Sequence, residues 1–239
     1  MNREQKMITE KKKISKFSPA VSAAEGYTKP FWKNSSFWIS CGMCMLPILF
    51  GISVYDALPE TIVTHWGANG APNGWSPKAM VVFGIPSFML LLNCVLWFML
   101  HNDPKMSNIP KIMLQIGKWS VPILSLTMET ITLFYTLYNS PEPARYIPFL
   151  LGLFIAAIGN YLPKCRPSYT VGIRLPWTLY DEENWVKTHR FGGKIWTICG
   201  FLIILAGFFS SEYLLMLAVF LMLVPPVVYS YLIYRNKHK

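Results

Sequence analysis

Residues 159–193 read GNYLPKCRPSYTVGIRLPWTLYDEENWVKTHRFGG, a polar and aromatic stretch between two apolar segments. A connector that only joined two helices could be short and need no particular residues, whereas this one is long and rich in Arg, Trp, Pro and Gly. That composition is typical of a loop whose geometry is constrained and which contacts something. The apolar segments on either side are long enough to cross a bilayer, and they indicate a membrane protein.

The composition of the whole chain supports this interpretation. Of 239 residues, 53% are hydrophobic and 14% charged, and the mean hydropathy is +0.34. A soluble domain of this size carries about a quarter charged residues. The sequence therefore predicts an all-α integral membrane protein with six transmembrane helices, which we expect at residues 36–55, 79–100, 114–138, 146–162, 194–209 and 213–234.

The distribution of positive charge predicts the orientation. Of the 22 Lys and Arg residues, 20 lie in the N-terminal tail, at the second and fourth connectors and at the C-terminus, and only Lys78 and Arg145 lie at the alternate connectors. Because Lys and Arg are retained on the cytoplasmic side, we expect both termini and residues 159–193 to be cytoplasmic. Residues 1–33 then form a basic cytoplasmic tail, and residues 34–239 form the membrane domain.

Several classes of function find no support in the sequence. The basic tail carries no nucleic-acid recognition motif, and we expect it to face anionic membrane lipid rather than bind nucleic acid. No HExxH, GxSxG, phosphate loop or pair of catalytic acids occurs, so we expect no enzyme. The five cysteines suggest helix packing rather than a disulfide or a metal site, and we predict no cofactor.

Two motifs carry a resemblance to a known family. Residues 55–75, YDALPETIVTHWGANGAPNGW, resemble the extracytoplasmic DUF1648 motif, which we place at residues 55–78, and residues 159–193 resemble the signature of the SdpI family. Thr64 stands where a Pro often precedes the His, and Asn73 where an Asp is common. The resemblance implies a six-span protein of the bacterial cell membrane that protects its producer from a secreted, membrane-active peptide toxin. It also implies that the protein can hold a small cytosolic repressor at the membrane.

The first outer loop holds one group of candidate residues, namely Asp56, His65, Trp66, Asn73 and Trp75. One interpretation is an aromatic belt at the headgroup level combined with a tight turn. The other is a rigid aromatic and polar surface that meets the toxin as it enters the outer leaflet. Asp56, Glu60 and His65 are too few ligands to predict a metal site.

Two polar residues fall within predicted spans. Glu129 is costly at membrane depth and must face protein or water. It is either a structural hydrogen-bond partner, of Asn160 or Lys118, or a proton-coupled or peptide-binding group. The second hypothesis fits an alternative function, an ion-coupled small transporter or peptide exporter. We expect Asn160 to bond between helices.

The cytoplasmic stretch holds the last group of candidates. Its prolines exclude a continuous helix, and Thr178 with Asp181 resembles a capping box. We expect a short interfacial helix over residues 182–190, ended by Gly192 and Gly193. The stretch is either a folded connector or a docking surface for a partner, and its candidate contact residues are Arg166, Arg174, Trp177, Asp181, Glu182, Asn184, Trp185, His189 and Arg190.

Overall fold

Six long helices dominate the computed structural model, which describes residues 30–67, 71–140 and 143–238. All six are long and apolar enough to cross a membrane, which confirms the predicted all-α membrane fold. Residues 1–29 of the predicted basic tail lie outside the described residues. The helices are α3 (Ser35–Ser53), α4 (Ile85–His101), α5 (Lys111–Tyr138), α6 (Pro143–Tyr161), α8 (Glu182–Phe209) and α9 (Glu212–Lys237).

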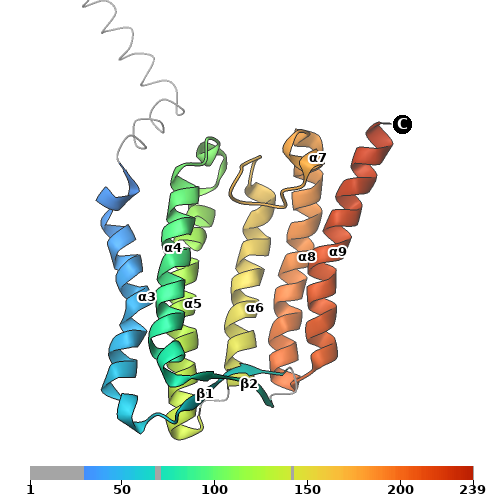
Figure 1. Ribbon diagram of the computed structural model, residues 1–239. Helices are drawn as coiled ribbons and strands as arrows, with labels where there is room; N and C mark the ends of the chain where they lie inside the picture. Colours follow the sequence, from blue (N-terminus) through green and yellow to red (C-terminus); the bar gives the residue numbers. More distant parts are fainter. Residues whose placement is uncertain (1–29, 68–70, 141–142, 239) are drawn as a thin grey trace, which may run out of the picture.

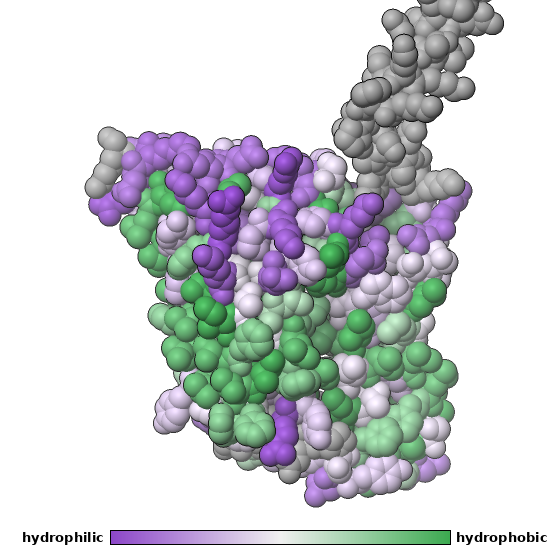
Figure 2. Space-filling view, turned by 180° about the vertical axis from the view of Figure 1, so that it is seen from behind, coloured by the Kyte–Doolittle hydropathy of each residue, from purple (hydrophilic) through white to green (hydrophobic). Residues whose placement is uncertain are grey.

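The helices form two groups of three (Figure 1). Helices α3, α4 and α5 pack on one another, α8 packs against both α6 and α9, and contacts between α5 and α6 are sparse. The start of α3 and the end of α9 lie at the same end of the bundle, which we call the terminus end. Figure 2 shows hydrophilic residues gathered at this end, above a band of hydrophobic surface.

Glycines spaced seven residues apart bring α6 and α8 together. Gly152 on α6 faces Gly200 on α8, and a Cβ added at Gly200 would lie 2.6 Å from the Gly152 carbonyl oxygen. Gly159 and Gly193 are equally close to the opposite helix. Small residues of this kind let transmembrane helices approach at backbone distance.

Helix α8 corrects the prediction of a short interfacial helix followed by a separate span. It runs without a break from Glu182 to Phe209 and passes through Gly192 and Gly193. A glycine inside a helix costs about 1 kcal/mol relative to alanine, yet here both glycines lie against neighbouring elements, where a side chain would clash. Their role is close packing and not helix termination.

The start of α8 also differs from the prediction. Asp181 is its N-cap, and its Oδ1 accepts hydrogen bonds from the backbone N–H groups of Glu183 and Asn184. Thr178 does not cap α8, because it belongs to a separate short helix, α7 (Pro176–Leu179), and its hydroxyl bonds within that turn. An Asp side chain at the N-cap satisfies N–H groups that the helix leaves free.

A β-hairpin, which the sequence analysis missed, closes the opposite end of the bundle (Figure 1). Strand β1 (Thr61–Trp66) pairs antiparallel with β2 (Pro72–Pro77), and Val63 lies opposite Trp75. Ile62 of β1 is buried in an apolar cluster with Leu133 of α5 and three further residues, Leu58, Val81 and Val82. This cluster, which we call the apolar plug, ties the hairpin to the first helix group. We call this end of the bundle the hairpin end.

Candidate functional site

A cavity of about 290 Å³ lies between the hairpin and the bundle. Residues 64–66 of β1 and the following Gly67 form one wall, and Thr132 of α5 contributes to another. The rest is mostly apolar and comes from α6, α8 and α9, for example Leu151, Ile203 and Leu215. The cavity therefore lies between the two helix groups, on the side that the hairpin covers.

Trp66 gives this cavity an unusual polar feature. Its ring packs edge-on against Tyr135, with the centroids 5.6 Å apart. Its indole Nε1 is buried, and it has no hydrogen-bond partner among the described residues. A buried donor without a partner is costly.

Two further hairpin residues are fixed by the strand pairing. The Nδ1 atom of His65 makes a hydrogen bond with Oδ1 of Asn73, which holds the two strands together near the turn. Asn73 therefore supplies the acceptor at the position where an Asp is common in this motif. Trp75 is 58% exposed and projects an apolar ring from the outer part of the hairpin.

The structure brings four of the five predicted outer-loop residues together on the hairpin. Asp56 is exposed in a short 3-10 helix, η2 (Tyr55–Ala57), before β1, and it does not line the cavity. Thr132 and the walls from α6, α8 and α9 were missed. No local signal marks them, because they meet the hairpin only through the packing of helices far apart in the sequence. Among the described residues, no cluster of His, Cys, Asp and Glu could hold a metal ion.

Glu129 does not pair with either predicted partner. Its side chain is 4% exposed, and its Oε1 has no hydrogen-bond partner among the described residues. Lys118 lies three turns away on the same helix, about 16 Å along the axis, and its ammonium lies over the ring of Trp97. Asn160 is exposed near the end of α6, and its predicted interhelical bond stays a prediction.

At the terminus end, the 165–175 loop of the signature is held by the loop between α4 and α5. The buried carboxylate of Asp103 accepts hydrogen bonds from the backbone N–H groups of Tyr169, at 3.0 Å, and Thr170, at 2.8 Å. Asn108 donates to the Pro167 carbonyl at 2.7 Å. Neither of these two polar anchors was predicted from the sequence.

The same loop is also fixed to α8 through His189 and Trp185, which are both fully buried. The Nε2 atom of His189 accepts from the Ile173 N–H at 2.9 Å, so its Nδ1 carries the proton and donates to the Trp185 carbonyl at 2.8 Å. The Trp185 indole donates to the carbonyl of Cys165. Gly172 has φ +125°, and any side chain there would strike both rings.

Cys165 is poorly suited to chemical labelling. It is buried beneath the loop, and burial raises the pKa of its thiol to about 11. A thiol in this state is inert.

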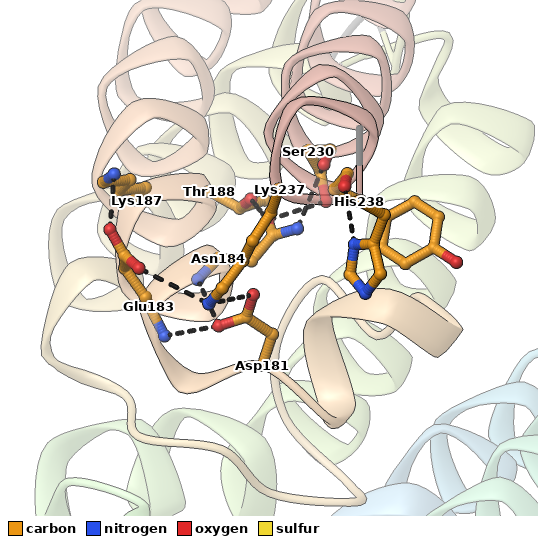
Figure 3. A network of polar contacts seen from close by, with 9 residues as sticks. Asp181, Glu183, Asn184, Lys187, Thr188, Ser230, Lys237 and His238 are labelled. Carbon is orange, nitrogen blue, oxygen red and sulfur yellow. Dashed lines mark hydrogen bonds and ion pairs between the residues drawn. The ribbon is translucent and has the colours of Figure 1, made fainter.

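A polar network joins the start of α8 to the end of α9 (Figure 3). Asn184 donates to the Ser230 carbonyl at 3.1 Å, and the Ser230 hydroxyl receives a hydrogen bond from the Trp177 indole at 2.7 Å. Lys237 lies 2.9 Å from Asp181 Oδ2 and 3.5 Å from Glu183. The hydrogen bond from Lys237 holds the pKa of Asp181 below its ordinary value.

The predicted contact residues of the cytoplasmic stretch therefore separate into two sets. Asn184, Trp185 and His189 are buried, and they hold the fold together with Asp181 and the half-buried Trp177. The remainder, Arg166, Arg174, Glu182 and Arg190, are exposed. A partner at this end would meet the exposed set, together with the accessible parts of Trp177 and Asp181.

Comparison with known proteins connects both ends of the molecule to one family. Residues 164–230 match the family model of the SdpI/YfhL protein family, and residues 42–90 match that of a domain of unknown function, DUF1648. The first region contains most of the signature, all of α8 and most of α9, and the second contains the hairpin with part of α3 and the start of α4. No solved structure matches the chain significantly.

Two curated relatives extend the comparison. The chain is 30% identical over 76 residues to an uncharacterized protein of Archaeoglobus fulgidus. This aligned region covers 29% of this chain and 42% of the relative. The chain is also 30% identical over 190 residues to Immunity protein SdpI of Bacillus subtilis strain 168. This second aligned region covers 80% of this chain and 90% of the relative. A match of that extent shows that the chain belongs to the SdpI/YfhL protein family.

Proposed function

We propose that this protein is an immunity protein of the bacterial cell membrane, which binds a secreted, membrane-active peptide toxin at its hairpin end. The observation that carries the proposal is the relationship to Immunity protein SdpI over nine-tenths of that protein's length. The orientation follows from the 20 Lys and Arg residues on the other side of the predicted spans, which put the hairpin outside the cell.

The hairpin cavity suits a peptide in two respects. Its apolar walls from α6, α8 and α9 would bury an apolar side chain, and the unpaired Nε1 of Trp66 would donate to a peptide carbonyl. Trp75 outside the cavity adds an exposed aromatic anchor of the kind that often dominates binding energy. A toxin held there would not insert into the bilayer.

The terminus end supports a separate role in signalling. The exposed side chains Arg166, Arg174, Glu182 and Arg190 lie on a loop and helix start that are fixed by the buried anchors described above. Rigid charged groups suit recognition of a small cytosolic repressor. On this proposal, membrane retention of the repressor depends on these residues, while protection does not.

The test is expression in a toxin-sensitive bacterium followed by challenge with membrane-active peptides. Trp66→Phe keeps an aromatic ring but removes the N–H donor, and Trp75→Ala removes the exposed ring. Each of these two variants should reduce survival. Trp32→Phe is the matched control, because Trp32 is 53% exposed and lies at the terminus end. Membrane abundance of each variant is measured by immunoblot. Full survival with both Trp66→Phe and Trp75→Ala at normal abundance would contradict binding at the hairpin.

A further inference from the structure

Polar side chains are concentrated inside the first helix group, at a depth where the predicted spans cross the membrane. Ser40 of α3, Asn93 of α4, and Ser125 and Glu129 of α5 are each less than 5% exposed. Among the described residues, four buried side-chain atoms lack a hydrogen-bond partner, and three of them belong to this group, namely Asn93 Oδ1, Trp97 Nε1 and Glu129 Oε1. Such atoms are usually satisfied by ordered water.

These side chains follow one another along α3, α4 and α5. The series begins toward the terminus end with Lys118, whose ammonium lies 4.7 Å from the centre of the Trp97 ring. One turn along α4, Asn93 donates to the Ser40 hydroxyl at 2.9 Å. One turn further along α3, the carbonyl of Cys44 accepts from Ser125 at 3.4 Å. Glu129 follows Ser125 by one more turn.

The series stops at Glu129. One turn beyond it lies Leu133, which is 0% exposed and belongs to the apolar plug with Ile62 of the hairpin. No apolar residue of the plug can hydrogen-bond to a carboxyl group. The polar residues therefore run along the group from Lys118 to Glu129, and on the hairpin side Glu129 is followed by the apolar plug and by Thr132, which lines the hairpin cavity.

No cation compensates Glu129. Among the described residues its carboxyl group forms no ion pair. The titratable side chains of the elements packed around α5 include two cysteines on α3, His65 on β1 and Arg145 on α6. The others are Cys94 and His101 on α4 and Tyr146 and Tyr161 on α6, and α5 itself carries Lys111, Lys118, Tyr135 and Tyr138. His65 is bonded to Asn73, Arg145 is exposed, and Lys118 is three turns away. An ionised carboxylate without a counter-ion is strongly disfavoured in such a place.

We propose that Glu129 is a proton-binding site at membrane depth, which exchanges its proton with water through the polar series between α3, α4 and α5. The carboxyl O–H bond breaks and re-forms as the proton passes to and from the water held by this series. This inference is independent of toxin immunity, and it supplies the group that an ion-coupled activity would need.

Infrared spectroscopy of the purified protein in lipid nanodiscs tests the proposal. At neutral pH the wild type should show a carboxylic-acid C=O band that is lost in Glu129→Gln. The matched control is Glu60→Gln, since the Glu60 side chain is 88% exposed and paired with Lys78, and this variant should keep the band. An identical band in wild type and Glu129→Gln, or no such band in either, would overturn the proposal.

Transfer to D2O tests the exchange without any substitution. The wild-type band should shift as the carboxyl proton is replaced by deuterium, and a band that does not shift would mean a sealed, structural acid. Asn93→Leu should slow the shift, whereas Leu133→Met, a conservative change in the plug, should not. Equal rates in Asn93→Leu and wild type would refute the route through α3, α4 and α5. The unfolding temperature of each variant shows whether it is folded.

Discussion

Asp103 and His189 show how single residues give the 165–175 loop its shape. Three backbone N–H groups, those of Lys105, Tyr169 and Thr170, are bonded to the Asp103 carboxylate, and a fourth, that of Ile173, is bonded to His189. A loop without regular secondary structure has to satisfy its backbone through side chains or water. These two side chains perform that task, which explains why they are buried.

Asp181 gives a prediction about pH. Its lowered pKa means that the folded protein binds this proton less readily than the unfolded chain, whose Asp pKa is about 3.9. The contribution of the Lys237 interaction is therefore fully present above about pH 4 and is lost as the pH falls through the folded pKa. Asp181→Asn keeps a capping oxygen but removes the charge.

At pH 7 the variant should be less stable than the wild type by at most about 1 kcal/mol, as for other partly exposed ion pairs. The difference should disappear in acid and shrink in high salt. Thermal unfolding in detergent across the pH range measures both effects. A difference that stays constant from neutral to strongly acidic pH would show that the charge is not responsible.

Among the elements, the contact between α6 and α8 depends most closely on residue size. At Gly200 an added Cβ would meet the backbone nitrogen of Ala156 and the carbonyl of Gly152, neither of which can move independently of its helix. Gly200→Ala should therefore push the helices apart. We expect a loss of about 1–3 kcal/mol, as for other overpacked sites.

Gly42 of α3 is the matched control for this prediction. A Cβ added there meets nothing within 4 Å, so Gly42→Ala should be neutral or stabilise the helix by up to about 1 kcal/mol. Unfolding temperatures in the same detergent compare the two variants. If both substitutions had the same effect, the close approach of α6 and α8 would not matter for stability.

At the scale of the whole molecule, the charge asymmetry and the structure together predict a definite topology. The start of α3, the end of α9 and the short helix α7 share the terminus end, and the hairpin lies at the opposite end (Figure 1). Tyr180 directly follows α7, and Glu60 directly precedes β1. Tyr180 is 92% exposed and the Glu60 side chain 88%, so a cysteine at either position would be accessible. The native cysteines are buried or half-buried.

An impermeant maleimide added to intact cells should therefore label Glu60→Cys but not Tyr180→Cys. After lysis it should label both, while the wild type serves as the background control. The physical reason is retention of Lys and Arg on the cytoplasmic side. Labelling of Tyr180→Cys in intact cells would show that the topology is the reverse of the predicted one, with the hairpin cavity inside the cell.

The amino-acid sequence by itself determined the six helices and the charge difference between their connectors. An apolar run of about 20 residues can satisfy its backbone in a bilayer only as a helix, so these features follow from local composition. The two motifs also identified the family without a structure. They did so through residues such as His65 and Trp66 near one end and Trp177 near the other.

Only the tertiary structure decided which polar residues are buried and what they contact. The hairpin, the unbroken α8, the anchoring by Asp103 and the isolation of Glu129 all depend on contacts between segments far apart in the chain. Gly193 shows the reason most clearly. By local preference it should end a helix, but the approach of α6 makes a residue without a side chain necessary at that position.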